Sequence, residues 1–396
     1  MKRYLSKYII SDLKDKMVFL WWPRQVWKTT LSKNIAKDKY KEYSYLNWDN
    51  ISDKKDIINT KYKWWSELII FDEIHKYKNW KNFLKWEFDK NNEKYDFLVT
   101  WSARLDIYQK WGDSLLWRYY YYRLHPLSLV EIIKRDNDFE NDFENDFEND
   151  FSLNFSDKFY QDEVDDLIKY GWFPEVYKKK DKRFLRRWIN DRKTRLIRED
   201  IRDLSNIRDI SSIEVLSILL PDRVGSLFSI NSLVEDLWVT HKTVSNWVDM
   251  LENIYYIYRI YPYNSSLIKS LKKEPKLFLW DWSELDNKWA RNENIIASCL
   301  LKFVHFLKDI HWYNATLSYV RDKEWREVDL AVIIEWKLEI LVEVKTKNKN
   351  ITNNLKYFTK KLSPTYSFQV VFDDKIDFEE NWIRVISASK FMTAFV

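Results

Sequence analysis

Two groups of residues in the first quarter of the chain combine side chains that can hold phosphate and a divalent cation. The first is the loop Trp22-Pro23-Arg24-Gln25-Val26-Trp27-Lys28-Thr29-Thr30, and the second is Asp72-Glu73, which ends the apolar run Leu68–Phe71. The loop keeps the lysine and hydroxyl of the pattern G-x-x-x-x-G-K-[ST]. In that pattern backbone N–H groups surround phosphates, the lysine contacts them, and the hydroxyl reaches a magnesium ion. Together the two groups predict that the chain binds ATP and Mg²⁺.

Four of these residues are expected to carry the chemistry. Lys28 would contact the phosphates, and Thr29 and Asp72 would hold Mg²⁺ through oxygen atoms. Glu73 would polarise the attacking water. An apolar strand ending in two acids is also common as a capped strand end, but its position 44 residues after Lys28 favours the catalytic interpretation.

Tryptophan stands at both glycine positions of the loop. The pattern uses glycine because the backbone turns there with positive φ and closes around the phosphates. The chain holds 3 Gly and 22 Trp in 396 residues, whereas ordinary proteins contain about 7% Gly. The loop is therefore either inactive or a glycine loop written with the wrong residue.

Sixteen of the tryptophans fall where turn chemistry or the resemblance to a known family expects glycine. They are Trp21, Trp22, Trp27, Trp64, Trp65, Trp86, Trp101, Trp111, Trp117, Trp172, Trp238, Trp289, Trp312, Trp325, Trp336 and Trp382. The other six are Trp48, Trp80, Trp188, Trp247, Trp280 and Trp282. Replacing the sixteen by glycine would raise the glycine content to about 5%, close to the ordinary share. Our hypothesis is that the gene uses the codon UGA for glycine, as some bacterial lineages do, and has been translated with UGA as tryptophan.

Apolar runs alternate with helical patterns through the first 135 residues. Strands are predicted at 17–20, 43–47, 68–71, 95–100 and 119–124. Alternating strands and helices predict an α/β fold with a parallel, doubly wound sheet. In such sheets ligands bind beyond the carboxyl ends of the strands, where both groups of residues would lie.

Apart from its tryptophans, the segment 21–30 resembles the loop of a prokaryotic AAA+ (P-loop) ATPase family that carries a C-terminal domain of unknown function. The resemblance implies that Thr100 or Ser102, in Thr100-Trp101-Ser102, places a hydroxyl near the γ-phosphate. It also implies that Arg118 stabilises the charge of the transferred phosphate. A hydroxyl that caps a helix and a surface arginine are the alternative interpretations.

The resemblance and the residue patterns together predict five segments. Residues 1–135 would form the ATPase domain, 136–152 an acidic loop, 153–215 a helical linker or lid, 216–265 a winged helix-turn-helix, and 266–396 a restriction-endonuclease-like α/β domain. The acidic loop repeats Asn-Asp-Phe-Glu, and its residues 136–150 hold eight acids and no base. Such a run repels itself and is typical of an exposed, weakly ordered segment.

The helix-turn-helix is predicted from Ser232–Leu237 and His241–Leu251, with Thr240 as the cap of the second helix. Apolar residues at helical spacing mark its buried face, and they are Val244, Trp247, Val248 and Leu251. Lys242, Thr243 and Asn246 would then point outward. These residues could enter a major groove of DNA, whereas a lid or a protein contact is the alternative.

The last segment contains a constellation of the PD-(D/E)xK type. Asp329 precedes Glu343-Val344-Lys345, and residues two apart in a strand share a face. Asp329 and Glu343 could bind a second Mg²⁺, Lys345 could orient water, and Glu293 would complete the set. For Asp329 to face Glu343, the hairpin needs a three-residue connection or a bulge near 335–337. A solvated strand face with alternating Lys and Glu is the alternative.

Composition narrows the class of protein. The single Cys299 excludes a disulfide framework, and no apolar run approaches the roughly 20 residues of a membrane span. We therefore expect a soluble, cytoplasmic protein without a membrane partner. The net charge is +5, and +13 outside residues 136–150, which suits a nucleic-acid partner but follows equally from AT-rich codon usage.

The sequence thus predicts an ATP-binding protein, a Mg²⁺-dependent ATPase coupled to a C-terminal DNA-binding or nuclease-like module. One alternative is a DNA-binding or nuclease protein that ATP switches. Another, if the tryptophans of the loop are real, is an inert interaction protein. DNA is a candidate partner besides ATP, and the oligomeric state is left open.

Overall fold

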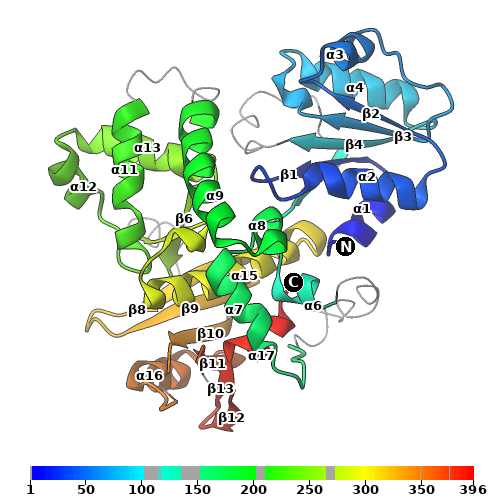
Figure 1. Ribbon diagram of the computed structural model, residues 1–396. Helices are drawn as coiled ribbons and strands as arrows, with labels where there is room; N and C mark the ends of the chain where they lie inside the picture. Colours follow the sequence, from blue (N-terminus) through cyan, green and yellow to red (C-terminus); the bar gives the residue numbers. More distant parts are fainter. Residues whose placement is uncertain are drawn as a thin grey trace. The chain divides into compact units, whose positions relative to one another are not determined.

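The computed structural model describes residues 2–101, 115, 117–134, 152–201, 210–264, 273–347, 349–373 and 375–396. They form two compact units, drawn in Figure 1. The first unit runs to Pro126, and the second contains Leu127–Ile133 and the described residues after 151. Lys134 belongs to the first unit again, and the domain boundary predicted at 135 stays a prediction. The acidic repeat lies outside the described residues.

A five-stranded parallel sheet forms the centre of the first unit. In the spatial order β2-β3-β4-β1-β5, its strands are β2 (Tyr43–Asn47), β3 (Leu68–Asp72), β4 (Asp96–Trp101), β1 (Met17–Trp21) and β5 (Tyr119–Arg123). β1 and β3 are buried along their whole length, as continuous apolar runs in parallel sheets usually are. The predicted α/β fold is confirmed for this unit.

Helices precede and connect these strands. They are α1 (Ser6–Asp12), α2 (Lys28–Lys39), α3 (Ile51–Ile58), the 3₁₀ turn η1 (Ile74–Lys76) and α4 (Trp80–Asn91). The loop that leaves β1 runs directly into α2, so the first turn of this helix lies beside the carboxyl end of β1 (Figure 1). Because β4 lies between β1 and β3, Thr100 is the register partner of both Leu20 and Asp72. The ends of these three strands therefore meet at one edge.

The second unit begins with helices. They are α6 (Leu129–Ile133), α7 (Gln161–Tyr170), α8 (Pro174–Lys179), α9 (Lys182–Arg195), the π-helical turn η2 (Leu196–Asp200), α11 (Ile210–Leu219), the 3₁₀ turn η3 (Pro221–Arg223), α12 (Ile230–Leu237) and α13 (His241–Asn253). Pro174 starts α8 after the extended Phe173, which is the position where a helix tolerates proline best. The Asp181 side chain accepts a hydrogen bond from the N–H of Phe184 and so caps α9.

An eight-stranded sheet follows. Its strands are β12 (Asp377–Glu380), β13 (Ile383–Ser387), β11 (Tyr366–Val371), β10 (Lys337–Lys345), β9 (Glu327–Ile334), β8 (Ala315–Arg321), β6 (Ile257–Pro262) and β7 (Lys276–Leu279), in that spatial order. β6 pairs with β7 and with β8. The domain boundary predicted between 265 and 266 would therefore cut a continuous sheet, and the structure does not divide the chain there.

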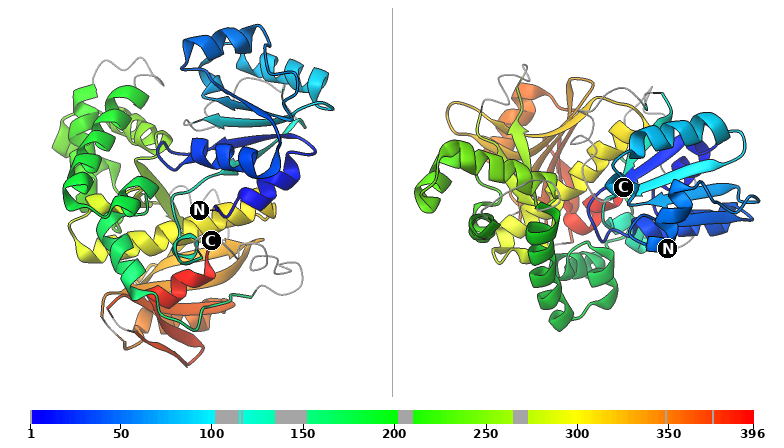
Figure 2. Two further views of the ribbon diagram at one scale, coloured as in Figure 1. Left: turned by 45° about the vertical axis from the view of Figure 1, so that its right-hand side comes forward. Right: turned by 90° about the horizontal axis from the view of Figure 1, so that it is seen from above.

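Helix α15 (Lys288–Ile310) crosses this sheet and contacts β8, β9 and β10 (Figure 2). The remaining short elements are η4 (Trp282–Glu284), α16 (Asn353–Leu362), α17 (Ala388–Phe391) and η5 (Met392–Ala394). One hydrophobic cluster joins Leu355 and Phe358 of α16 to Ala331 and Leu341 of the sheet. Within the described ranges, no helix combines the length and the apolar character needed to cross a bilayer.

Candidate functional site

The phosphate loop turns with positive φ at three positions. Trp22 has a φ of 148°, Gln25 of 68° and Trp27 of 66°. A side chain in the left-handed helical region is strained by about 1–2 kcal/mol, whereas glycine adopts that region freely. Trp27 directly precedes α2, whose N-terminal N–H groups can receive phosphate. The backbone therefore has the form of a phosphate loop although tryptophan occupies its glycine positions.

Lys28 folds back over this loop. Its ammonium group donates hydrogen bonds to the carbonyl oxygens of Trp22 and Pro23, each at 2.7 Å, and the side chain is buried. Val26 is buried as well, and its carbonyl oxygen accepts a hydrogen bond from Arg3 at 2.9 Å. Lys28 and Arg3 thus both stabilise the loop through hydrogen bonds to its carbonyl oxygens.

Asp72 connects the loop to the two neighbouring strands. Its Oδ2 accepts hydrogen bonds from the hydroxyl of Thr29 at 2.9 Å and from that of Tyr45 at 2.5 Å, and its Oδ1 accepts one from Thr100. Oxygen ligands about 2.1 Å from an octahedral Mg²⁺ lie about 3 Å from each other. The distance between Thr29 and Asp72 therefore fits two ligands of one magnesium ion.

Glu73 lies beside a neutral histidine. Its carboxylate is 3.6 Å from Nε2 of His75 and 4.0 Å from Nζ of Lys76. Burial, together with the positive charge of Lys76, lowers the pKa of His75 to about 3. Lys76 also pairs with Asp49 at 2.7 Å. His75 therefore carries no charge near pH 7, so of these two neighbours the cation beside Glu73 is Lys76 and not the histidine.

A pocket of about 390 Å³ joins these residues. It is lined by Arg24, Gln25, Trp27, Lys28, Thr29, Thr30, Asn47, Asp49, Asp72, Glu73 and Lys76. The lining combines cations, hydroxyls and two adjacent carboxylates, which suit phosphate and a divalent cation. Trp27 lines the pocket, whereas Trp22 packs against Trp21 and His125, with ring centroids 5.1 Å from each. Sequence reasoning missed Tyr45 and Lys76, because only the fold brings them to this edge.

One residue predicted for this site, Arg118, is not found there. Ser102 lies outside the described residues. Arg118 precedes β5, and its carbonyl oxygen accepts a hydrogen bond from the N–H of Met17, where β1 begins. In parallel strands that is the edge opposite the phosphate loop, and the Arg118 guanidinium pairs there with Asp89 at 2.6 Å. The structure therefore does not bring Arg118 to the phosphate loop of its own chain.

The tryptophans differ in backbone conformation and exposure. Those with positive φ are Trp22, Trp27, Trp117, Trp238, Trp312, Trp325, Trp336 and Trp382. Those with exposed side chains are Trp64, Trp65, Trp86, Trp117, Trp238, Trp289, Trp312, Trp325, Trp336 and Trp382. Every residue in both sets belongs to the sixteen assigned to glycine. The other six tryptophans are all described, and none of them has a positive φ or an exposed side chain.

Two of the tryptophans with positive φ lie in two-residue hairpin turns. Glu335 and Trp336 connect β9 to β10 with φ values of 46° and 68°, and Asn381 and Trp382 connect β12 to β13 with 53° and 63°. A two-residue turn with both φ values positive has the geometry of type I′, for which Asn-Gly is a preferred sequence. Glycine at 382 would complete that dipeptide.

Trp172 does not follow the pattern. Its φ is not positive, its indole is buried, and its N–H donates to the carbonyl oxygen of Trp280 at 2.7 Å. The adjacent Gly171 has the positive φ of this turn, 74°. Trp21 and Trp101 are also buried, but their indole N–H groups have no hydrogen-bond partner among the described residues. The assignment to glycine is thus supported more strongly at the turns than at these three positions.

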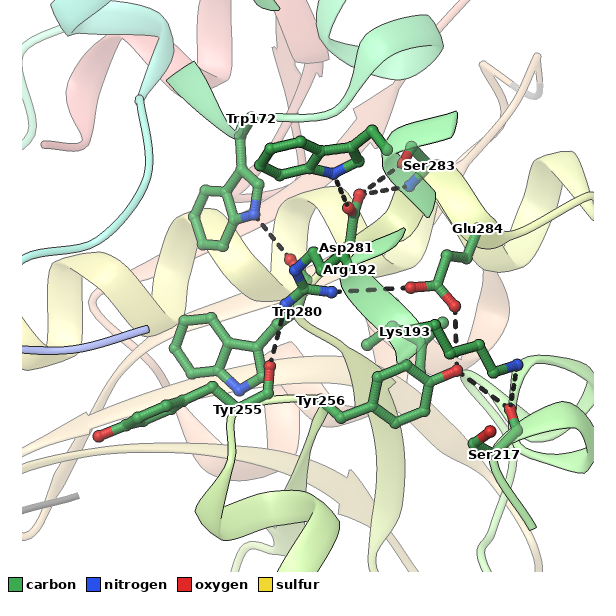
Figure 3. A network of polar contacts seen from close by, with 12 residues as sticks. Trp172, Arg192, Lys193, Ser217, Tyr255, Tyr256, Trp280, Asp281, Ser283 and Glu284 are labelled. Carbon is green, nitrogen blue, oxygen red and sulfur yellow. Dashed lines mark hydrogen bonds and ion pairs between the residues drawn. The ribbon is translucent and has the colours of Figure 1, made fainter. Parts of the chain in front are cut away.

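Trp172 and Trp280 belong to a buried polar network in the second unit (Figure 3). Arg192 lies 3.6 Å from Glu284, and the hydroxyl of Tyr256 donates to Glu284 at 2.9 Å. Burial raises the pKa of Glu284 to about 7, against the lowering effect of Arg192. The network joins α9 to η4 and to the residues before β6.

The four residues predicted for a nuclease-like site lie close together. Glu293 is on α15, Asp329 on β9, and Glu343 and Lys345 on β10. Oδ2 of Asp329 accepts a hydrogen bond from the N–H of Val344 at 2.8 Å, and Lys345 pairs with Glu343 at 2.7 Å. The expected bulge is present, but it lies between Leu338 and Ile340, beyond the turn.

Two further charged residues complete this carboxylate cluster. Nζ of Lys276, on β7, lies 3.0 Å from Glu293, 2.8 Å from Glu327 and 3.6 Å from Asp329. Only 1% of Lys276 is exposed. Sequence reasoning missed Lys276 because a single lysine at the start of an apolar strand gives no sign of burial. We use the name carboxylate cluster for the six residues Lys276, Glu293, Glu327, Asp329, Glu343 and Lys345.

The pKa values of residues in the carboxylate cluster differ from their ordinary values. Burial raises the pKa of Glu293 to about 8 and that of Glu343 to about 7, and the charge of Asp329 raises both. Burial by itself lowers the pKa of Lys276, but the carboxylates around the ammonium outweigh it, so that the pKa lies above its ordinary value. Lys276 therefore stays charged, while two of the carboxyls bind protons near neutral pH.

The carboxylate cluster does not fit a divalent cation as it stands. Across the described parts of the chain, no three His, Cys, Asp or Glu side chains are grouped so that they could hold a metal ion. The ammonium of Lys276 lies among the oxygens of Glu293, Glu327 and Asp329. This arrangement does not meet the expectation that Asp329 and Glu343 hold Mg²⁺.

The helix pair predicted at 232–251 is present as α12 and α13. Thr240 caps α13 by accepting a hydrogen bond from the N–H of Thr243. Trp238 ends α12 in the left-handed conformation with 93% of its side chain exposed. Lys242 and Asn246 are exposed on α13, while the four residues predicted for the buried face are buried.

A parallel sheet whose first strand enters a phosphate loop, and whose third strand ends in an adjacent pair of acids, identifies the first unit as a P-loop nucleotide-binding fold. The family model for an AAA domain matches residues 14–133. A second model, for a domain of unknown function (DUF8612), matches residues 161–285, which include the polar network of Figure 3.

Two curated relatives are uncharacterized proteins. MJ1637 of Methanocaldococcus jannaschii is 24% identical over 313 residues, 70% of this chain and 63% of that protein. A protein of Haemophilus influenzae is 24% identical over 262 residues, 63% of this chain and 60% of that protein. The chain therefore spans less than two thirds of either relative. Among solved structures, the RuvB Holliday junction branch migration motor of Thermotoga maritima is 19% identical, with a TM-score of 0.32 over 64% of this chain and 87% of that chain.

Proposed function

We propose that the chain binds ATP in its first unit and hydrolyses it with Mg²⁺. The observation that carries this proposal is the 2.9 Å hydrogen bond between Thr29 and Asp72, in a pocket that Lys28 and Glu73 also line. These residues come from the loop after β1 and from the end of β3. The match of residues 14–133 to an AAA domain supports the same conclusion.

Each residue has a defined role in this proposal. Lys28 and the N–H groups at the start of α2 bind the phosphates, and Thr29 and Asp72 hold the magnesium ion. When bound, this ion neutralises charge on the transferred phosphoryl group. Glu73, next to Asp72 in the wall of the same pocket, orients the attacking water and accepts its proton. Thr100 and Tyr45 fix the carboxylate of Asp72.

We further propose that the natural protein carries glycine at the positions where the printed sequence has tryptophan with a positive φ. Positive φ and exposure occur only within the group of sixteen that motif and turn chemistry had selected. With glycine at 27, the pocket loses an indole from its wall and the loop loses the strain of its left-handed turn. This separates the ATPase from the alternative of an inert interaction protein.

The test is an ATPase assay of two full-length preparations, one with the printed sequence and one with glycine at the sixteen positions. We expect Mg²⁺-dependent turnover from the glycine preparation, reduced at least ~100-fold in Lys28→Ala and in Glu73→Gln. Lys37→Ala, an exposed residue in the last turn of the same helix, is the matched control and should retain activity.

Absence of turnover from the glycine preparation, or turnover that survives Lys28→Ala, would contradict the ATPase proposal. The codons test the glycine proposal separately. UGG at positions 22 and 27 of the gene would refute it.

As a second function, we propose that α12 and α13 bind DNA. The observation that favours it is the exposed pair Lys242 and Asn246 on the outer face of a capped second helix. Fluorescence anisotropy with duplex DNA should show weaker binding by Lys242→Glu, with a shallower dependence on salt. Lys178→Glu, on the exposed end of α8, is the control; equal losses in both variants would leave only a nonspecific charge effect and reject the assignment to α13.

A further inference from the structure

Outside the phosphate loop, the ammonium of Lys276 is a buried charge in contact with three carboxylates. It touches carboxylates from two elements, α15 and β9, at 3.0 Å for Glu293 and 2.8 Å for Glu327. Asp329, also on β9, follows at 3.6 Å. A buried charge requires such partners, because the cost of removing it from water is otherwise several kcal/mol. Lys276 is thus the cation around which these side chains are arranged.

The backbone around Lys276 restricts its movement. Its strand, β7, pairs with β6, and Lys276 itself bridges to Leu227. Gly225 closes the same region: its N–H donates to the carbonyl oxygen of Leu277, and a Cβ at Gly225 would lie 2.8 Å from Oε2 of Glu293. The ammonium is therefore enclosed, unlike the partly exposed ammonium of Lys345.

Within the carboxylate cluster, two buried carboxylate oxygens have no hydrogen-bond partner among the described residues. They are Oε2 of Glu293 and Oε2 of Glu343. Both side chains are more than nine-tenths buried. Buried carboxylate oxygens normally find a donor or a cation, so these two atoms mark an acceptor capacity that Lys276 and Lys345 leave unused.

We propose that the ammonium of Lys276 occupies the position at which a PD-(D/E)xK-type site would hold its divalent cation. The carboxylate cluster therefore already contains an internal cation, and it binds a divalent ion only when that ammonium is removed. The inference concerns residues outside the ATP pocket and outside the sixteen tryptophans. It does not depend on the ATPase proposal.

A consequence is that the second unit is no metal-dependent nuclease in its resting state. Of the carboxylates that a nuclease would use to hold a divalent ion, Glu293 and Asp329 contact the internal Lys276, and Glu343 pairs with Lys345. Lys276 faces Glu327 and Asp329, Lys345 faces Glu343, and Arg321 lies 3.4 Å from Glu327. These three cations balance three carboxylates, and burial raises the pKa of the fourth, Glu293, to about 8, so that it binds a proton near neutral pH. A bound metal cation is not needed to keep the carboxylate cluster folded.

The test is Mn²⁺ binding, followed by loss of the electron paramagnetic resonance signal of free Mn²⁺, in the nucleotide-free full chain with glycine at the sixteen positions. All samples carry Asp72→Asn, which removes the metal ligand of the phosphate loop. The pH is about 9, where Glu343 and Glu293, with pKa values of about 7 and about 8 beside the intact Lys276, are largely ionised in the background chain.

We expect the Asp72→Asn background to bind no Mn²⁺ with a Kd below about 1 mM, and Lys276→Met to add one site at least tenfold tighter. Asp329→Asn added to Lys276→Met should abolish that site. Lys345→Met is the matched control: it removes the other lysine of the carboxylate cluster but leaves the enclosed ammonium in place, so it should add no site.

Two results would overturn the inference. One is a Mn²⁺ site in the background that Asp329→Asn abolishes, because a metal would then be bound beside the intact Lys276. The other is a folded Lys276→Met chain, judged by circular dichroism, that binds no Mn²⁺. If Lys276→Met does not fold, the comparison of the background with its Asp329→Asn variant still decides. The inference is supported if neither sample binds Mn²⁺, and it is refuted if the background binds Mn²⁺ at a site that Asp329→Asn removes.

Discussion

Asp72 accepts hydrogen bonds from Thr29, Tyr45 and Thr100, which lie on α2, β2 and β4. A carboxylate held from three elements has a fixed orientation before any ligand arrives. Outer partners of this kind typically change metal affinity by about 10–100-fold when they are removed. The residues that tune the proposed magnesium site are thus found on neighbouring strands and not in the sequence motif.

Tyr45→Phe and Thr100→Val should each raise the Mg²⁺ concentration that ATP hydrolysis requires by about 10–100-fold. Each substitution removes one hydrogen bond that orients Asp72. The measurement is the Mg²⁺ concentration that gives half-maximal turnover in the glycine preparation. Tyr40→Phe is the matched control, since Tyr40 makes the same kind of hydrogen bond to Asp96 at the opposite end of the sheet, where β4 begins. A loss in Tyr40→Phe as large as that in Tyr45→Phe would contradict the assignment.

Trp336→Gly should raise the free energy of unfolding by about 1 kcal/mol, because it relieves a left-handed backbone at an exposed turn. Trp280→Gly should lower it by more than about 3 kcal/mol, since that indole is buried and donates to the carbonyl oxygen of Ile257. Chemical denaturation of the full printed chain measures both. If both substitutions destabilise the chain equally, exposure and φ do not separate the two groups of tryptophan.

At the scale of elements, α15 contains two ionisable side chains with no exposed surface, in different surroundings. Glu293 faces the carboxylate cluster, and Lys302 pairs with Glu131 of α6, both side chains being fully buried. The N–H of Ser128 also donates to Glu131 at 3.0 Å. Since α6 follows β5 in the chain, this ion pair fastens the segment that leaves the first sheet to the longest helix among the described elements.

Lys302→Met should lower the free energy of unfolding by about 3–5 kcal/mol, because Glu131 would keep a buried charge without its cation. Adding Glu131→Gln should recover most of this loss. Lys180→Met is the control: its ion pair with Asp166 is partly exposed, so the expected effect is below about 1 kcal/mol. A double variant no more stable than Lys302→Met would mean that the charge of Glu131 is not the cause.

The strands of the first unit could be predicted from the sequence because each is a short apolar run between turn residues, and Leu68–Asp72 shows this most clearly. The helix pair at 230–253 was equally readable from the spacing of Val244 and Trp247. Pairing across long intervals was not: nothing local indicates that Lys276 of β7 meets Glu293 and Asp329. The edge at which Arg118 lies likewise follows from strand direction, which a motif does not encode.

At the scale of the whole molecule, pH should act on the two units in opposite directions. Glu284, Glu293 and Glu343 have pKa values raised to about 7, about 8 and about 7 by burial, against an ordinary value near 4.3. Between these pKa values the folded chain keeps protons that the unfolded chain releases. The contribution of these three carboxyls to the stability of the second unit is therefore lost as pH rises from about 4.5 through about 8. In the first unit, the lowered pKa of His75, about 3, contributes stability that is lost as pH falls below about 6.5.

Denaturant unfolding of the full chain between pH 5 and pH 9 checks this prediction. Lowering the pH from 8 to 5 should stabilise the second unit and destabilise the first, which separates their transitions. Glu293→Gln and Glu343→Gln should each flatten the dependence of the second unit, and His75→Gln that of the first. Parallel pH curves for both units would contradict the assignment of the titrating groups.

The phosphate loop begins at the end of β1, and Trp21, the last residue of that strand, is the first of the sixteen. If its codon is UGA, a cell that reads UGA as stop releases a peptide ending at Leu20, before any residue of the nucleotide pocket. The gene is then silent in every organism that reads UGA as stop, however readily its DNA is exchanged. Its activity can be inherited only together with the matching transfer RNA, and in the laboratory it requires a recoded gene.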